Sequence, residues 1–232
     1  MTDQVAELEG VTTALKGIRR TAARKMIEAH EAPVFQLSVE VDMTSALTVK
    51  RIVPGSTVTD HIIRSCAIAL SRHPAVNAWY SDLAVTTFER VNIGVAVATD
   101  AGLMVPVVQD VGTDDLAAVA GKRRDVVERA RAGTLAMPDV TGGTFTISNL
   151  GMLGIDRFTA ILNVPQVAIL AVGSTKPRYV WRDGGHVVDG GGEWRQTAEF
   201  TLTCDHRAVD GATGALFLAD LRALVEAGPA AG

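Results

Sequence analysis

The chain has 232 residues, of which 47% are hydrophobic and 21% charged, a composition that excludes a mostly disordered protein and allows one sizeable core. Its formal net charge of −4 disfavours nucleic acid as the main partner, because phosphate binding needs an excess of lysine and arginine. No apolar run approaches the ~20 residues of a membrane span, and the acidic first ten residues do not resemble a signal peptide.

The first predicted elements follow an N-terminal segment, residues 1–14, that lacks sustained periodicity and is interpreted as an arm or linker remnant. A helix is predicted from about Leu15 to His30, ending before a proline. Alternating apolar and polar residues then predict a strand from Val34 to Val41. Apolar residues at helical spacing predict a second helix over Thr57–His73.

The second half of the chain is richer in strand signals. β-Branched residues predict two or three strands between Ala84 and Val108, followed by a helix over Thr113–Arg131. Strands dominate from Gly143 to Cys204, and a last helix begins at Gly211. This order predicts one α+β domain, residues 15–232, with a largely mixed sheet.

The most informative segment is Thr203–Gly211, where the last strand meets the last helix. His206 lies at this junction, four residues before Asp210, which is placed to cap the helix. The helix N-terminus and the neighbouring cation Arg207 both oppose protonation of the imidazole, so we expect a neutral general base. The alternative is a structural histidine beside an ordinary N-cap.

A second segment, Gly142–Gly151, alternates hydroxyl and apolar side chains along a predicted strand. Thr144, Thr146 and Ser148 share one face, and Ser148 lies at the strand end. One interpretation is a polar face that lines a crevice, with Ser148 in reach of a substrate. The other is that these hydroxyls face solvent or bond to neighbouring strands, since threonine is a common strand residue.

Four motifs in this chain resemble those of the dihydrolipoamide acyltransferase components of 2-oxoacid dehydrogenase complexes. The resemblance extends from about Leu15 to Val225, and its motifs are Arg19–Met26 with Pro33–Phe35, Gly143–Gly151, Asn163–Leu170 and His206–Gly211. Chloramphenicol acetyltransferase shares the fold, but there another histidine precedes the active one, where this chain has Asp205. The implied fold is α+β, a two-layer sandwich with a largely mixed β-sheet and helices on one face.

The resemblance implies an acyltransferase catalytic domain that moves an acyl group from S-acyl-dihydrolipoamide to coenzyme A. His206 would take the thiol proton, Ser148 would donate to the oxyanion, and Asp210 would support the loop by pairing with Arg19 or Arg20. Coenzyme A is then a substrate, and the lipoyl group comes from a separate lipoyl domain that is not in this chain.

The resemblance also implies a homotrimer with active sites between subunits. A larger cubic core is left open, because Glu226–Gly232 offers almost no apolar anchor for contacts between trimers. Lipoyl domains and the other components of the complex are the expected partners, and nucleic acid and membranes are not. Succinyl-transferring relatives tend to have a second glycine where this chain has Leu150, which argues against a succinyl group. Between branched-chain and acetyl groups, the prediction leans to branched-chain. The alternative function is a non-catalytic trimeric scaffold, against which the intact His206 and Ser148 argue.

Three other site hypotheses have weaker support. Cys204 and His206, two residues apart, could form a nucleophile–base pair. The two cysteines, Cys66 and Cys204, are expected instead to be buried thiols. The expected setting is reducing and cytoplasmic. Asp205, His206 and Asp210 are too few for a metal site, so none is expected. The basic face of the first helix could bind the phosphates of coenzyme A, although a solvated face or a subunit contact is favoured. This face consists of Lys16, Arg19, Arg20, Arg24 and Lys25.

Overall fold

The computed structural model describes residues 10–181 and 192–229. Most of the predicted N-terminal arm, residues 1–9, lies outside the described residues, while residues 10–16 form neither helix nor strand. The α-helices are α1 (Gly17–His30), α2 (Val49–Ile52), α3 (Val58–Arg72), α4 (Leu116–Ala132) and α5 (Gly211–Ala227). Short 3-10 turns lie at Ala46–Thr48, Met137–Val140 and Gly151–Leu153.

The main sheet has seven strands in the order β1-β11-β9-β8-β4-β7, with β10 paired to β11. β8 pairs in parallel with β4 and β9, whereas the other neighbours are antiparallel, so the predicted mixed sheet is confirmed. The strands are β1 (Val34–Asp42), β4 (Ile93–Val95), β7 (Val107–Val108), β8 (Phe145–Asn149), β9 (Ala168–Val172), β10 (Lys176–Val180) and β11 (Glu193–Asp205).

Two small hairpins lie beside this sheet, formed by β2 (Ala78–Ser81) with β3 (Ala84–Thr87), and by β5 (Val97–Thr99) with β6 (Gly102–Met104). The prediction of two or three strands between Ala84 and Val108 is therefore wrong, since five short strands occupy that range. β2 was not predicted. Its hairpin turns at Asp82 and Leu83, which both adopt positive φ angles; aspartate is common in such turns, whereas leucine is not a turn signal.

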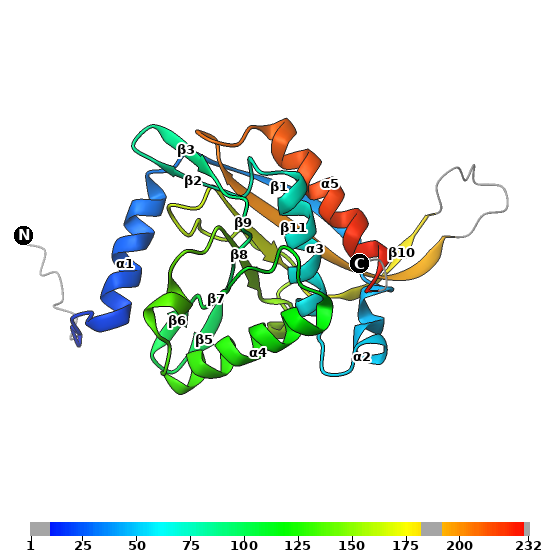
Figure 1. Cartoon of the computed structure of the whole chain (residues 1–232), viewed down its shortest axis with the longest axis horizontal. Helices are drawn as coiled ribbons and strands as arrows, with labels where there is room; N and C mark the ends of the chain where they lie inside the picture. Colours follow the sequence, from blue (N-terminus) through cyan, green and yellow to red (C-terminus); the bar gives the residue numbers. More distant parts are fainter. Residues whose placement is uncertain (1–9, 182–191, 230–232) are drawn as a thin grey trace, which may run out of the picture.

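The core lies between one face of the sheet and α3, α4 and α5 (Figure 1). α5 buries Phe217, Leu221 and Val225 completely against α3 and the strands. The prediction of helices on one face holds for these three. The other face is covered in part by the end of α1 and a neighbouring segment, through a smaller cluster of Ala29, Ala32, Leu162, Val164 and Ile169.

α3 begins where the sequence predicted, because Thr57 and Asp60 form a reciprocal capping box. The fully buried Asp60 also accepts hydrogen bonds of 2.6 and 3.1 Å from Arg123 on α4. One carboxylate thus caps α3 and neutralises a largely buried cation. The pair fixes α4 against α3 at one end of the helical layer.

We expect Asp60→Ala to lower the free energy of unfolding by about 3–5 kcal/mol, because removing one partner leaves the other charge buried and unpaired. Urea unfolding followed by far-UV circular dichroism measures this loss. Asp125→Ala is the control, since its Arg129 partner is four residues away and the Asp125 side chain is 67% exposed. Equal shifts in the two variants would contradict a structural role for the buried pair.

Candidate active site

His206 lies in the turn between β11 and α5, with its side chain exposed. Its backbone N–H donates to the Pro33 carbonyl oxygen at 2.9 Å, and its ring centroid lies 4.6 Å from that of Phe35. The turn is therefore held against the start of β1 while the imidazole remains accessible. This is the position expected of a general base that meets an incoming substrate.

A glycine lies where α5 packs against β1 beside this turn. A Cβ atom at Gly214 would lie 2.8 Å from Cδ1 of Leu37, so a larger residue there would require the Leu37 side chain to move. Asp210 caps the same turn, accepting a 2.7 Å hydrogen bond from the Thr213 N–H. The first turn of α5, which follows His206 in the chain, is thereby held in place.

Asp210 is a helix cap in this structure, as the sequence predicted. The hydrogen bond from the Thr213 amide, which is the main cause, lowers the pKa of Asp210 below its ordinary value. Within one described chain Asp210 does not pair with Arg19 or Arg20, so this pairing stays a prediction. α1 packs beside β6 instead, and Arg19 lies near Gly102.

Ser148 lies near the end of β8 and is partly buried. Its neighbours in the predicted hydroxyl row differ from it. Thr146 is buried and donates to the Gln166 side chain at 2.6 Å, and Thr144 exchanges hydrogen bonds with the Asn92 backbone. The crevice interpretation is therefore wrong for the two threonines, whose hydroxyls are used inside the fold, and it remains open for Ser148 alone.

Ser148 and His206 of one chain lie far apart. The strand register aligns Ser148 with Ala171 on β9 and Ala171 with Thr201 on β11. Two strand spacings separate Ser148 from Thr201 by about 10 Å, and five residues carry the chain on to His206, about 17 Å along β11. Because neither side chain can span that separation, the two groups cannot act on one substrate within a single chain.

Arg207 does not stand as a free cation beside the imidazole. Its guanidinium binds the Asp205 carboxylate, with Nη2 at 2.7 Å from Oδ2. The cation expected beside His206 is therefore paired with a buried carboxylate. The sequence interpretation missed this pair, although an acid and an arginine two positions apart at a strand end was the available signal.

The nucleophile hypothesis for Cys204 is not supported. Cys204 is completely buried in the core between the sheet and α5. Burial, with a smaller contribution from Asp205, raises the pKa of the Cys204 thiol to about 12, so it is not ionised at neutral pH. Cys66 is likewise free and buried, as predicted for both cysteines.

No group of three or more His, Cys, Asp or Glu side chains that could hold a metal ion occurs among residues 10–181 and 192–229. In the predicted tract, Asp205 is bound by Arg207 and Asp210 by a helix amide. Within the same described ranges, no helix is long and apolar enough to cross a membrane.

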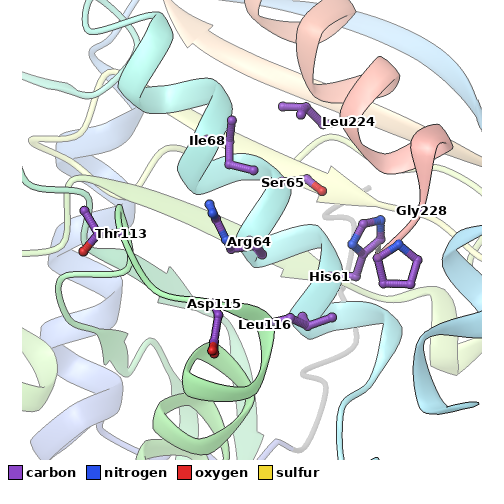
Figure 2. A pocket seen from close by; sticks show the side chains of 10 residues that line it. His61, Arg64, Ser65, Ile68, Thr113, Asp115, Leu116, Leu224 and Gly228 are labelled. Atoms are coloured by element: carbon purple, nitrogen blue, oxygen red, sulfur yellow. The ribbon is translucent and has the colours of Figure 1, made fainter. Parts of the chain in front are cut away.

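A recess lined by residues of α3, α5 and the segment at the start of α4 (Figure 2) lies at the opposite end of α5 from His206. Leu224 on its wall is 13 residues into α5, which places it about 20 Å along the helix from the His206 turn. Burial lowers the pKa of His61 in this recess, and its Nε2 lies 3.2 Å from the Val225 carbonyl oxygen. His61 therefore links α3 to α5 and is remote from the candidate catalytic groups.

Comparison with solved structures defines the class of fold. Dihydrolipoamide acetyltransferase from Azotobacter vinelandii superposes with a TM-score of 0.87 and 29% identity, over 97% of this chain and 95% of that chain. The truncated catalytic core of a 2-oxoacid dehydrogenase complex from Thermoplasma acidophilum gives 0.83 and 32%, over 94% and 98%. Chloramphenicol acetyltransferase, at 0.58 and 13% identity, covers 87% of this chain and 94% of its own, and shows the fold alone. The chain thus has the predicted chloramphenicol acetyltransferase-like fold.

Sequence comparison then identifies the family. The model described as 2-oxoacid dehydrogenases acyltransferase (catalytic domain) matches residues 8–231, so the chain belongs to this family of acyltransferases. The acetyltransferase component of the Caenorhabditis elegans mitochondrial pyruvate dehydrogenase complex is 34% identical over 91% of this chain and 44% of that protein. The Zymomonas mobilis component is also 34% identical, over 91% and 49%. The chain therefore spans about half the length of these curated relatives.

We expect Asp210→Ala to lower the unfolding temperature at neutral pH, whereas Asp210→Asn, an equally good N-cap, preserves it. Because the folded pKa lies below the unfolded value of about 3.9, the stabilisation by the ionised carboxylate is complete above the unfolded pKa. It is lost as pH falls through the folded pKa. Thermal scans between pH 7 and pH 2 should therefore show the wild-type and Asp210→Ala curves converging in acid. A gap that widens in acid would contradict this assignment.

Proposed function

We propose that this chain catalyses acetyl transfer between dihydrolipoamide and coenzyme A, as the catalytic domain of the acyltransferase of a pyruvate dehydrogenase complex. The observation that carries the proposal is the exposed His206 at the β11–α5 turn, fixed against β1 and the start of α5. Acetyl replaces the earlier preference for a branched-chain group, because the relatives described above are named acetyltransferase components.

The chemistry is a thioester exchange. A thiol with a pKa near 8.5 is only a few per cent ionised at neutral pH, so a base that removes its proton accelerates attack. The His206 imidazole takes the proton of the coenzyme A thiol while the sulfur bonds to the acetyl carbonyl carbon. The resulting oxyanion accepts a hydrogen bond from the Ser148 hydroxyl. When the intermediate collapses, the carbon–sulfur bond to dihydrolipoamide breaks, and the imidazolium returns the proton to the departing sulfur.

The Azotobacter vinelandii enzyme offers independent support for these assignments. Its structure is described as part of investigations on the role of a serine, a histidine and an asparagine in the catalytic mechanism, the last two four positions apart. His206 and Asp210 have the same spacing, and Ser148 supplies the hydroxyl. An aspartate in place of the asparagine is compatible with the same capping geometry.

We propose that the active site lies between subunits of a homotrimer, with His206 from one chain and Ser148 from the next. The separation of roughly 20 Å between these groups within one chain supports this arrangement, since a second copy must complete the site. The structure of the cubic core of a pyruvate dehydrogenase multienzyme complex, with a TM-score of 0.87, supports assembly of such trimers into a larger core.

The remaining partners follow from the same proposal. A separate lipoyl domain carries the acetyl group, and the other components of the complex load and reoxidise it. This chain matches 44% of the Caenorhabditis elegans relative, which leaves room in that protein for further domains. Two free, buried cysteines support the reducing, cytoplasmic setting expected from the sequence.

The direct test is transfer of an acetyl group from acetyl-CoA to free dihydrolipoamide, the reverse reaction, by the purified chain. His206→Ala should lower kcat by about 10²–10⁴-fold through loss of the base. Ser148→Ala should lower kcat by about 10²–10³-fold through loss of an oxyanion donor, with little change in KM. A folded wild-type assembly with no activity would support the scaffold alternative, and full turnover in Ser148→Ala would remove the oxyanion role.

The acyl preference is tested by comparing kcat/KM for acetyl-CoA and isobutyryl-CoA in the same assay. We expect acetyl-CoA to be preferred by at least tenfold, because two additional methyl groups must be accommodated in a site shaped for a smaller acyl group. Succinyl-CoA is the charged control. A preference for isobutyryl-CoA would contradict the pyruvate dehydrogenase assignment while leaving the acyltransferase mechanism intact.

A further inference from the structure

The two neighbours of His206 in the chain bind each other. Arg207 donates four hydrogen bonds of 2.7–3.2 Å to the Asp205 carboxylate, one from its backbone N–H and three from its guanidinium. Asp205 is only 2% exposed, so its charge is compensated almost entirely by this arginine. Hydrogen bonding to Asp205 in turn raises the pKa of Arg207.

The Arg207 guanidinium also lies over an aromatic ring. Its Cζ is 4.0 Å from the ring centroid of Tyr80, a cation–π contact that fixes the second face of the group. Tyr80 is itself anchored on β2, since its N–H donates to the Pro165 carbonyl oxygen at 2.8 Å. The clamp formed by Asp205, Arg207 and Tyr80 thus connects the His206 turn to the small β2–β3 hairpin.

Backbone hydrogen bonds also connect the His206 turn to β2. The Asp205 N–H donates to the Val167 carbonyl oxygen at 2.9 Å, and the Val167 N–H donates to the Ala78 carbonyl oxygen at 3.1 Å. The carbonyl oxygen of Asp205 accepts from the N–H groups of Ala208 and Val209. The Asp205 end of the turn is therefore tied to β2 through Val167, and the far end of the turn is tied back to Asp205.

We infer that Asp205 and Arg207, supported by Tyr80, are positioning residues that set the direction in which His206 presents its imidazole; this inference rests on the proposed function. A turn of two or three residues has few backbone bonds to define it, so a side-chain clamp across His206 narrows its backbone conformations. Displacement of a reacting group by about 1 Å can cost on the order of 10²-fold in rate. The clamp acts through His206 and makes no contact with substrate.

A direct role for Arg207 in binding the phosphates of coenzyme A is disfavoured by the same contacts. Its Nε and Nη2 groups are bound to Asp205 and its face lies against Tyr80. An arginine that recognises a phosphate usually presents two parallel N–H groups to it. Here those N–H groups are occupied by a buried carboxylate.

The test is a double-mutant cycle in the acetyl transfer assay with Asp205→Asn, Arg207→Met and the double variant. We expect each single variant to lower kcat by about 10–100-fold with KM for acetyl-CoA within about twofold of wild type. The double variant should lose no more than the worse single, because the two residues act as one unit. Tyr80→Phe, which keeps the aromatic face, should retain kcat, whereas Tyr80→Leu should lower it.

Arg222→Met is the matched control, because it removes an arginine from an exposed carboxylate pair with Glu226 on α5, and it should leave kcat unchanged. Active-site concentration is corrected by the folded fraction from circular dichroism. An Asp205→Asn variant with wild-type kcat per folded chain overturns the inference, as does an Arg207→Met variant changed only in KM for acetyl-CoA. An inactive wild type would instead refute the proposed function, so the two failures are distinguishable.

Discussion

The register of β8, β9 and β11 determines how far apart Ser148 and His206 lie in one chain. β8 and β9 run in parallel and β11 runs antiparallel to them, so the C-terminal ends of β8 and β11 point in opposite directions along the strands. Ser148 lies near the C-terminal end of β8, and His206 follows the C-terminal end of β11. A shift of register by one residue would turn every side chain to the other face, and the fully buried Phe145, Ile147, Leu170 and Leu202 prevent this. The hydrophobic core therefore keeps Ser148 and His206 of one chain apart, and the proposal that a second copy completes the site rests on this separation.

Several interactions of different kinds hold the turn that carries His206. Gly214 lies where α5 packs against β1, Asp210 caps the first turn of that helix, and Asp205 binds Arg207 across the histidine. Together they fix a turn that protrudes from the sheet and would otherwise have little to restrain it, and they leave the imidazole exposed.

Much of this architecture could be predicted from the residue pattern. The alternation of β1 and the helical spacing of α3 and α5 gave bounds within a few residues of those observed, because each element buries one continuous face. The short strands between Ala84 and Val108 could not be counted, since two- and three-residue strands have no period to detect. β2 was missed for the same reason, although it supports Tyr80 beside the candidate site.

The places of the candidate site residues on their strands and turns could be predicted, but the geometry of the site and the pairing of Asp205 with Arg207 could not. His206 and Asp210 followed from a strand–helix junction, whereas the separation from Ser148 depended on strand order, which no local pattern encodes. The hydroxyl row showed the limit clearly: Thr144 and Thr146 satisfy buried backbone and amide partners, and only their tertiary neighbours distinguish them from Ser148.

Complementation between two inactive chains tests most directly whether catalysis is shared between subunits. His206→Ala and Ser148→Ala variants, inactive alone, are dissociated, mixed in equal amounts and reassembled, with wild type treated in parallel. A shared site is intact only where an unaltered histidine meets an unaltered serine, so random mixing predicts recovery of about one quarter of wild-type activity. A mixture no more active than its parents, while reassembled wild type is fully active, would contradict a site formed between subunits.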